Sequence, residues 1–505
     1  MQSHPFLELS QFRQIEKVAS SKYKLDLIDR AGNAIVAWIN SNIPKVGSIL
    51  VLVGSGNNGA DAVSAANKLK DQYKYDVTLL LTCDKPNSNA QKLITQFKKL
   101  KGKVLTTPPA NFKKYSLIID GIVGIGINKA NFKNELATLI NQVNTSKVAI
   151  LALDTPSGID PFSGNMANTA IKANYTLTFI ADKIGLHTGF AVDHCGEITV
   201  MPLVDLDNYE IKLPTIEFNL LENIDYLKLI RSTRNTSKGN FGNIAIIGGG
   251  SNMHGALYLA GRAALLTGCG RVTLGFVDKD FTCDYQMPEL IATSAKAVID
   301  NLNLYDVVIV GPGLGMCDKA LKALTKIIEM RPKTQMIFDA DGLNLIAKNE
   351  DLQYLFRMIP NKIITPHPLE AARLLDQESK AITQNRLATL HKLSEKFNAI
   401  TLLKGAGSLI SSNGAIFINQ FANPTLSSAG NGDTLCGIIA SLIAQGLDAT
   451  MALRFAIYLH GRSGSELAST YLSNKPNSNY DIYNGISASE IALYCRKLLN
   501  EILYK

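Results

Sequence analysis

The sequence predicts two consecutive α/β domains, each built around a parallel sheet. Short apolar runs rich in Val, Ile and Leu alternate with helix-like segments, as expected of strands that are buried on both faces. This alternation stops after Pro202 and restarts near Asn243. The chain has 505 residues, of which 46% are hydrophobic, and this is enough for more than one core.

The first domain, residues 1–210, is predicted to be a Rossmann-like, doubly wound α/β domain. Its strands are predicted at 48–54, 77–82, 117–120, 148–154, 175–180 and 197–200. Helix-like segments between such strands are typical of a parallel sheet with crossover helices. Residues 211–225 are predicted to be the linker, because periodicity is lost after Pro202 and a second proline follows.

The second domain, residues 226–505, repeats the same alternation. Its strands are predicted at 243–250, 307–310, 336–339, 362–365 and 400–404. Ligands of open α/β sheets bind at the carboxyl ends of the strands. The loops that follow the strands are therefore expected to converge on one crevice, namely 311–315, 339–341, 365–368 and 404–408.

Composition limits the partners and the compartment. A formal charge of +8 is modest for this length, and aromatic and basic residues are not interleaved as in nucleic-acid-binding proteins. The first residues lack a signal-peptide pattern, and no apolar run approaches the roughly 20 residues that span a bilayer. Seven cysteines without any Cys-x-x-Cys spacing favour reduced thiols. We therefore expect a cytoplasmic protein that binds neither membrane nor nucleic acid.

The segment that ends at Asp433 carries the most specific chemistry. Gly430 and Gly432 allow the backbone to turn its N–H groups inward, and the apolar run 434–445 predicts a helix whose positive N-terminus faces them. Beside such an anion site, Asp433 is predicted to take a proton from a hydroxyl that attacks a phosphoryl group. The structural alternative is that Asp433 only caps the helix.

A glycine-rich loop follows the first strand. The run from Gly54 to Gly59 fits the G-x-G-x-x-G fingerprint of dinucleotide-binding folds. Asp61 follows it at the start of the helix, where a carboxylate would repel a pyrophosphate. An NAD-dependent dehydrogenase stays open as an alternative, because Asp84 ends the second strand, where a ribose-binding carboxylate would lie.

Polar side chains also follow other strands of the first domain. Asn58, Asp120 and Ser157 would bring an amide oxygen, a carboxylate and a hydroxyl to the crevice. Such a set suits a hard, oxygen-loving cation. Turn chemistry, in which Asp and Ser bind nearby N–H groups, is the alternative for each of them.

These motifs resemble those of a known family. The loops 56–61, 120–126 and 153–160 are similar to the signature loops of NAD(P)H-hydrate epimerase domains, and the second half resembles the ADP-dependent NAD(P)H-hydrate dehydratases. Together they resemble the bifunctional NAD(P)H-hydrate repair enzymes over nearly the whole chain. The resemblance implies a three-layer αβα domain that interconverts the R and S forms of hydrated NADH and NADPH. It implies a ribokinase-like second domain that dehydrates the S form at the expense of ADP, giving AMP and phosphate.

The resemblance also implies residue roles in the first domain. Asp154 is expected to be catalytic and to bind the hydrated cofactor near its reacting carbon, Lys183 to lie near the site, and K⁺ to bind Asn58, Asp120 and Ser157. The other expected contacts to the hydrated cofactor come from Asn57, Asn58, Gly59, Ala60 and Asp61, and from Gly124, Ile125, Gly126, Ile127, Asn128, Lys129 and Ala130. Ala60 stands where the family usually has glycine, so a methyl group is expected beside the ligand.

In the second domain the resemblance implies two sets of contacts. The hydrated cofactor is expected at Ala256, Gly315, His367 and Asp433. ADP, and AMP after transfer, are expected at Lys404, Gly405, Ala406, Gly407, Ser408 and Gly432, with Mg²⁺ offsetting the phosphate charge. Leu369 stands before Glu370 where the family commonly has glycine. A homo-oligomer is also expected.

Two other functions remain open for this sequence. The second half could be a ribokinase-like small-molecule kinase, because the same Gly-x-Gly-Asp anion hole serves both chemistries, and the first half would then be a nucleotide-binding domain with weak or no epimerase activity. A kinase would release a phosphorylated product. In the third reading, one half is a non-catalytic module that binds nucleotide without turnover.

Overall fold

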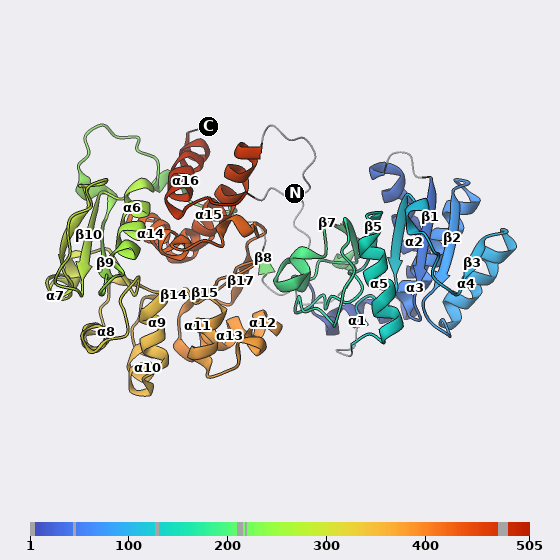
Figure 1. Cartoon of the computed structure of the whole chain (residues 1–505), viewed down its shortest axis with the longest axis horizontal. Coiled ribbons are helices and arrows are strands. Elements are labelled where there is room, and N and C mark those ends of the chain that lie inside the picture. The colour runs from blue at the N-terminus through green and yellow to red at the C-terminus, as the bar shows by residue number, and fades with distance from the viewer. Residues whose placement is uncertain are drawn as a thin grey trace. The chain divides into compact units, whose positions relative to one another are not determined.

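The computed structural model describes residues 6–43, 47–126, 131–209, 216–217, 220–472 and 483–504. The chain divides into two compact units, the N-terminal unit Met1–Pro214 and the C-terminal unit Thr215–Lys505. Each unit has helices packed on a mainly parallel sheet (Figure 1). The predicted α/β class is therefore confirmed.

The sheet of the N-terminal unit has seven strands in the order β3-β2-β1-β4-β5-β6-β7, and all neighbours are parallel. The strands are β1 (Ser48–Val53), β2 (Asp76–Leu81), β3 (Lys103–Leu105), β4 (Leu117–Gly121), β5 (Ala149–Leu153), β6 (Tyr175–Phe179) and β7 (Glu197–Met201). The strand order reverses between β1 and β4. A ligand crevice is expected at the carboxyl ends of these two strands.

Helices cover both faces of this sheet, and alternate residues of β1 face opposite cores. Ile49, Val51 and Val53 pack with side chains of α1 to α4, whereas Leu50 and Leu52 pack with α5. These helices are α1 (Leu9–Ser21), α2 (Leu27–Asn42), α3 (Asn57–Asp71), α4 (Ser88–Lys99) and α5 (Asn134–Thr145). The unit is thus a three-layer αβα sandwich.

The sheet of the C-terminal unit has ten strands in the order β11-β10-β9-β12-β13-β14-β15-β16-β17-β8. Neighbours from β11 to β15 are parallel, and β15, β16 and β17 pair antiparallel. The strands are β8 (Ile216–Glu217), β9 (Asn243–Gly248), β10 (Arg271–Phe276), β11 (Ile291–Ser294), β12 (Val307–Val310), β13 (Gln335–Phe338), β14 (Lys362–Ile364), β15 (Ile400–Leu403), β16 (Leu409–Ser412) and β17 (Ala415–Ile418). The strand order reverses between β9 and β12.

Two groups of helices flank this second sheet. The helices α6, α14, α15 and α16 share one large core with the strands, and Figure 1 shows α8 to α13 on the other side of β14 and β15. The helices are α6 (His254–Leu266), α7 (Ala295–Ile299), α8 (Asp318–Met330), α9 (Ala340–Ala347), α10 (Glu350–Arg357), α11 (Pro368–Leu375), α12 (Ser379–Gln384), α13 (Arg386–Phe397), α14 (Asn431–Ala444), α15 (Ala449–Leu472) and α16 (Ala488–Leu503).

Every strand predicted from the sequence is present, and the structure adds β3, β8, β10, β11, β16 and β17. β3 and β8 have only three and two residues, and polar residues interrupt the apolar residues of β10, β11 and β16. Part of the predicted linker lies outside the described residues. The part that is described belongs to the C-terminal unit, because β8 pairs with β17 and because Leu220 and Ile224 lie in its core.

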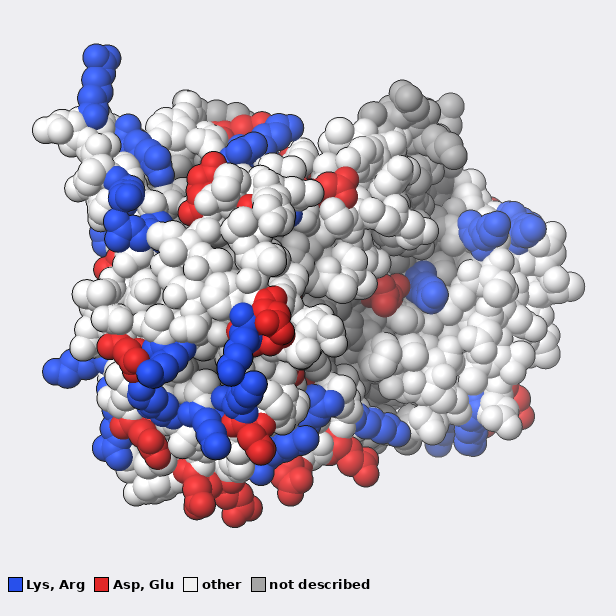
Figure 2. All heavy atoms as spheres, turned by 60° about the vertical axis from the view of Figure 1, so that its left-hand side comes forward, with Lys and Arg blue, Asp and Glu red and all other residues white. Residues whose placement is uncertain are grey.

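The described surface and side chains give three further facts. All seven cysteines are free thiols. Throughout the described ranges, every helix is too short or too polar to cross a membrane. Figure 2 shows acidic and basic side chains interspersed on the face that it presents.

Candidate active sites

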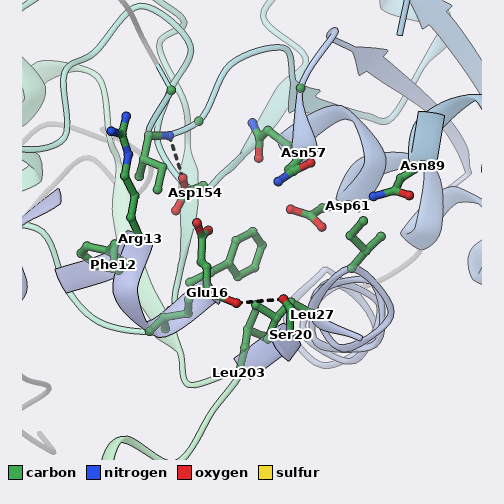
Figure 3. A pocket seen from close by; sticks show the side chains of 18 of the residues that line it. Phe12, Arg13, Glu16, Ser20, Leu27, Asn57, Asp61, Asn89, Asp154 and Leu203 are labelled. Atoms are coloured by element: carbon green, nitrogen blue, oxygen red, sulfur yellow. Dashed lines mark hydrogen bonds between the residues drawn. The ribbon is translucent and has the colours of Figure 1, made fainter. Parts of the chain in front are cut away.

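A cavity of about 830 Å³ lies in the N-terminal unit, beyond the carboxyl ends of β1, β4 and β5 (Figure 3). Its walls come from α1, from the α1–α2 connection and from the loops that follow these strands. The lining residues are Phe12, Arg13, Glu16, Ser20, Lys24–Ile28, Ser55–Asn58, Asp61, Asn89, Ile122–Gly126, Asp154, Phe179, Ile180 and Leu203. The cavity thus lies where the strand order reverses between β1 and β4, which is where a ligand crevice is expected.

Glycine brings the β1–α3 turn close to this cavity. A β-carbon on Gly59 would lie 2.3 Å from the carbonyl oxygen of Gly54, which is closer than β-carbons approach other atoms in real proteins. Only glycine therefore fits at this position without a shift of the backbone. The first turn of α3 can therefore rest directly on the end of β1. As a result, Asn57, Asn58 and Asp61 reach the cavity wall.

Asp154 follows β5 in a left-handed conformation, with φ of 67°. Its carboxylate accepts a hydrogen bond of 2.9 Å from the N–H of Ile125 and lies 2.9 Å from the Nζ of Lys183. Lys183 is fully buried, and its Nζ lies 4.5 Å from the centre of the Phe12 ring. Few non-glycine residues adopt this backbone region, and aspartate is among those that do so most readily.

Two more carboxyl groups face the same cavity, Asp61 from α3 and Glu16 from α1 (Figure 3). Burial raises the pKa of Asp61 well above its ordinary value, and the charges of Asp154 and Glu16 raise it further. Burial, followed by the charge of Asp154, also raises the pKa of Glu16. The cavity therefore combines two carboxyl groups whose pKa values are raised with the carboxyl of Asp154, which pairs with Lys183.

The predicted cation ligands occupy the loops beside this cavity. Asp120 is buried, and its two oxygens accept hydrogen bonds from the Oγ of Ser157 at 2.7 Å and from its N–H at 2.8 Å. Burial raises the pKa of Asp120 to about 6. Asn58 is only 7% exposed, and neither polar atom of its carboxamide has a hydrogen-bond partner. Because buried amides are normally partnered, this amide and the neighbouring oxygens fit the ligand preference of a hard cation.

Most of the predicted cofactor-binding residues that the structure describes line the cavity. These are Asn57, Asn58, Asp61, Gly124, Ile125, Gly126 and Asp154. Gly59 and Ala60 are buried and do not line it. The methyl group of Ala60 is fully buried, so it does not narrow the cavity. Ile127, Asn128, Lys129 and Ala130 lie outside the described residues.

Helix α1 contributes residues to this site that the sequence motifs did not indicate. Phe12, Arg13 and Glu16 line the cavity but belong to no glycine-rich or strand-end motif. The available signal was the spacing of Phe12, Ile15 and Ala19, which are the buried residues of an amphipathic helix. Glu16 follows Ile15 on the border of that buried face.

In the C-terminal unit, charged side chains from three segments meet at the carboxyl ends of the strands. The Nζ of Lys404 lies 2.6 Å from Asp339 and 4.0 Å from Glu370. Asp339 also accepts hydrogen bonds from the Oγ1 of Thr365 at 2.8 Å and from the thiol of Cys436 at 3.3 Å. Burial opposes the ionisation of Asp339, but the charge of Lys404 outweighs it and lowers the pKa of the carboxyl. The buried pair is therefore charged.

Asp433 lies in the first turn of α14, above this pair. Gly430, with φ of 88°, is the N-cap, so Asp433 does not cap the helix. A β-carbon on Gly432 would lie 3.4 Å from the Nζ of Lys404, which shows how closely the helix start approaches the lysine. Burial, followed by the charge of Asp339, raises the pKa of Asp433 to about 7. A carboxyl with this pKa can act as a general base near neutral pH.

His367 caps the N-terminus of α11 and is held in one tautomer. Its Nδ1 accepts hydrogen bonds from the N–H groups of Leu369 and Glu370 at 3.1 and 3.3 Å. The proton of the neutral ring is therefore on Nε2, which lies 3.2 Å from a carboxyl oxygen of Glu370. Burial and the charge of Lys404 lower the pKa of His367. Leu369 stands before Glu370, where a glycine was expected from the resemblance, and this capping arrangement forms with the leucine in place.

The turn from Lys404 to Ser408 is built around the buried Arg386. The guanidinium donates hydrogen bonds of 3.3 Å to the carbonyl oxygens of Leu403, Lys404 and Gly407. Gly405 and Gly407 have φ of 134° and 63°. Because a peptide N–H points away from the carbonyl of the preceding residue, the N–H groups of Gly405 and Ser408 are directed away from Arg386.

Two more predicted residues lie beside the switch between β9 and β12. The N–H of Gly315 donates to Asp341 at 2.8 Å. A β-carbon on Gly313 would lie 3.1 Å from that of Ala256, so α6 packs on the loop that carries Gly315. Asp341 and Asp339 both raise the pKa of Asp433, which connects this loop electrostatically with α14.

Comparison with known proteins agrees with the two-unit organisation. Residues 24–185 match the family described as YjeF-related protein N-terminus, and residues 244–481 match the family described as NAD(P)H-hydrate dehydratase. The bifunctional NAD(P)H-hydrate repair enzyme Nnr of Coxiella burnetii is 32% identical over 469 residues, which cover 91% of this chain and 94% of that protein. The Nnr enzyme of Escherichia coli is 33% identical over 456 residues, covering 88% and 86%.

A ribokinase-like superfamily protein from Enterococcus faecalis is among the similar solved structures. It has a TM-score of 0.48 and 23% identity, covering 58% of this chain and 99% of that one. The two curated relatives match both units over nearly their full lengths. The chain belongs to the family of bifunctional NAD(P)H-hydrate repair enzymes.

Proposed function

We propose that this chain repairs hydrated NADH and NADPH with both of its units. The N-terminal unit interconverts the R and S forms, and the C-terminal unit dehydrates the S form with ADP as co-substrate, giving AMP and phosphate. Membership of the repair-enzyme family supports both activities.

The position of Asp433 is the observation that carries the dehydratase mechanism. It combines a helix N-terminus with a base whose pKa is about 7. Asp433 takes the proton of the ring hydroxyl as the hydroxyl oxygen attacks the terminal phosphorus of ADP. The C–O bond then breaks with loss of phosphate, and loss of a proton from the adjacent carbon restores the C=C bond. Phosphorylation turns hydroxide into a good leaving group, which explains the use of a nucleotide.

Lys404 and the following turn are proposed to bind ADP, and then AMP, together with Gly432. The N–H groups of Gly405 and Ser408 that point away from Arg386, and the start of α14, offer donors to phosphate. Ala256, Gly315 and His367 are proposed to contact the hydrated cofactor. Mg²⁺ is proposed to offset the phosphate charge. The described side chains include no group of three or more His, Cys, Asp or Glu that could hold it, so the phosphates are its proposed main ligands.

Asp154 is the proposed catalytic carboxylate of the epimerase unit. It faces the cavity with its charge balanced by Lys183, and Asn57, Asn58, Asp61 and the 124–126 segment line the space around it. We propose that Asn58, Asp120 and Ser157 hold K⁺. The unpartnered carboxamide of Asn58 supports this role. The ion would supply positive charge beside the substrate.

The test uses the purified full-length chain with a mixture of R and S hydrated NADH, ADP, Mg²⁺ and K⁺. We expect the absorbance of reduced nicotinamide to recover for both epimers. Recovery that stops at the S fraction would leave only the dehydratase proposal standing. Absence of recovery, with the nucleotide consumed to phosphorylate another alcohol, would indicate a kinase instead.

A further inference from the structure

We propose that Glu16 of α1 is a second acid–base residue of the epimerase reaction and works with Asp154 from another wall of the cavity. The inference rests on the proposed epimerase function and assigns a further residue to it.

Glu16 lies on the face of α1 that lines the cavity. Phe12, Glu16 and Ser20 are spaced four residues apart on α1, so they lie along one face of the helix, and all three line the cavity. Figure 3 shows the carboxyl group of Glu16 directed toward Asp154. The two carboxyl groups come from different elements, α1 and the end of β5.

Glu16 has charged neighbours from several elements. Arg13 comes from its own helix, Asp154 and Lys183 from beyond β5 and β6, and Asp61 from α3, while Lys24 and Asp26 lie in the connection to α2. Lys183 is committed to Asp154 by the ion pair of 2.9 Å. The negative charge of Asp154 disfavours ionisation of Glu16. Glu16, whose pKa is raised by burial and by the charge of Asp154, therefore keeps its proton more readily than an exposed glutamate.

Asn58 also indicates a ligand site in this cavity, independently of the carboxyl groups. Asn58 lines the same cavity, is 7% exposed, and has an amide whose polar atoms lack partners. A buried amide in this state is characteristic of a site that binds a polar ligand or ion. Glu16 thus faces a space that is organised for ligand binding.

The chemistry of the substrate requires such a pair. Hydration of an enamine places the new hydroxyl on the carbon bonded to the ring nitrogen. Glu16 gives its proton to this hydroxyl, the C–O bond breaks with its electron pair on the departing water, and the nitrogen lone pair stabilises the cation. Water then adds to the opposite face, and Asp154 takes its proton. In the reverse epimerisation, Asp154 gives the proton to the hydroxyl and Glu16 takes the proton of the added water. One water leaves and one water adds in each direction, so the reaction consumes no net water and needs no oxidant or reductant.

The test compares E16Q with E135Q, a control at an exposed glutamate of α5 in the same unit. Each chain is incubated with the purified R form of hydrated NADH without ADP, and the S form is measured by chromatography. We expect E16Q to lower kcat by about 100-fold with KM changed less than about twofold, because glutamine keeps the shape but cannot transfer a proton. E135Q should match the wild-type chain, and E16D should recover part of the lost rate.

A pH profile gives the second readout. The protonated form of Glu16 acts as the acid, so wild-type epimerisation of the R form should decline as pH rises through the raised pKa of this residue, and E16Q should lack that decline. The fluorescence of Trp38 in E16Q should equal that of the wild-type chain, which checks the folding of the N-terminal unit. Unchanged kcat and an unchanged profile in E16Q would overturn the assignment. If the wild-type chain itself fails to interconvert the forms, the proposed epimerase function fails instead.

Discussion

At the residue scale, the ion pair of Lys404 and Asp339 contributes to the stability of the C-terminal unit, because Lys404 balances the buried charge of Asp339. The lysine lies 2.6 Å from a carboxylate that is only 2% exposed. K404M would leave that buried charge unpaired, and we expect it to lower the free energy of unfolding of the C-terminal unit by about 3 to 5 kcal/mol. Urea unfolding followed by circular dichroism measures this change.

K348M is the matched control, because Lys348 is exposed on the same unit. The double variant K404M/D339N removes both charges and should be less destabilised than the sum of its single variants. Strict additivity of the two single variants would show that the pair does not stabilise the fold.

The role of Asp433 gives the second prediction at this scale. D433N keeps the size of the side chain but removes the base, so ADP-dependent dehydration of the S form should fall by about 10²-fold or more. D318N changes an exposed aspartate in the first turn of α8 and should retain full activity. Both variants should still interconvert the two forms without ADP. Dehydration by D433N at the wild-type rate would rule out Asp433 as the base.

The pKa of Asp433, raised to about 7, predicts how dehydration depends on pH. The base acts in its ionised form, so the rate with the S form should increase as pH rises through about 7 and should be lost below it. Burial also raises the pKa of Glu370 to about 7. E370Q should keep the pH-dependent increase, whereas a rate that does not vary between about pH 6 and pH 8 would contradict the assignment.

At the element scale, the contact between β1 and α3 is set by one glycine. G59A would place a methyl group 2.3 Å from the carbonyl oxygen of Gly54, so we expect the free energy of unfolding of the N-terminal unit to fall by about 1 to 3 kcal/mol. Trp38, the single tryptophan of the chain, is buried in α2, so its fluorescence during urea unfolding reports on this unit.

G47A is the control for this contact. A β-carbon on Gly47 would lie 3.6 Å from the Oγ of Ser116, which is ordinary van der Waals contact. Its unfolding midpoint should stay close to that of the wild-type chain. Equal midpoints for G59A and G47A would mean that α3 can move away from β1 without loss of stability.

At the scale of the whole molecule, two separate sites should act in sequence on one substrate pool. With mixed hydrated NADH and ADP, D154N should recover only the S fraction, whereas D433N should recover nothing although it still interconverts the forms. An equal mixture of the two variant chains should recover the full absorbance, because each supplies the activity that the other lacks. Recovery by the mixture that stops at the S fraction would show that both sites must be intact in one chain.

Local sequence determined much of the architecture. Each apolar run that predicted a strand coincides with a strand of the structure, because burial on both faces selects Val, Ile and Leu. Strands such as β10 stayed hidden, because the sheet around them, rather than their own composition, holds them extended. The motifs at strand ends likewise indicated Asp154 and Lys404, since parallel strands bring their carboxyl ends to one edge. The glycines before the predicted helix 434–445 indicated Asp433.

Only the tertiary structure decided which charged side chains, distant from each other in the sequence, lie close together. No spacing relates Glu16 in the first helix to Asp154 after the fifth strand, or Arg386 to the turn that it supports after β15. The neighbours that shift the pKa of Asp433 also come from separate loops. The sequence by itself therefore determined the two α/β units and the chemical types at their strand ends. Packing of remote segments decided the protonation of those groups, because burial and neighbouring charge are properties of three-dimensional contact.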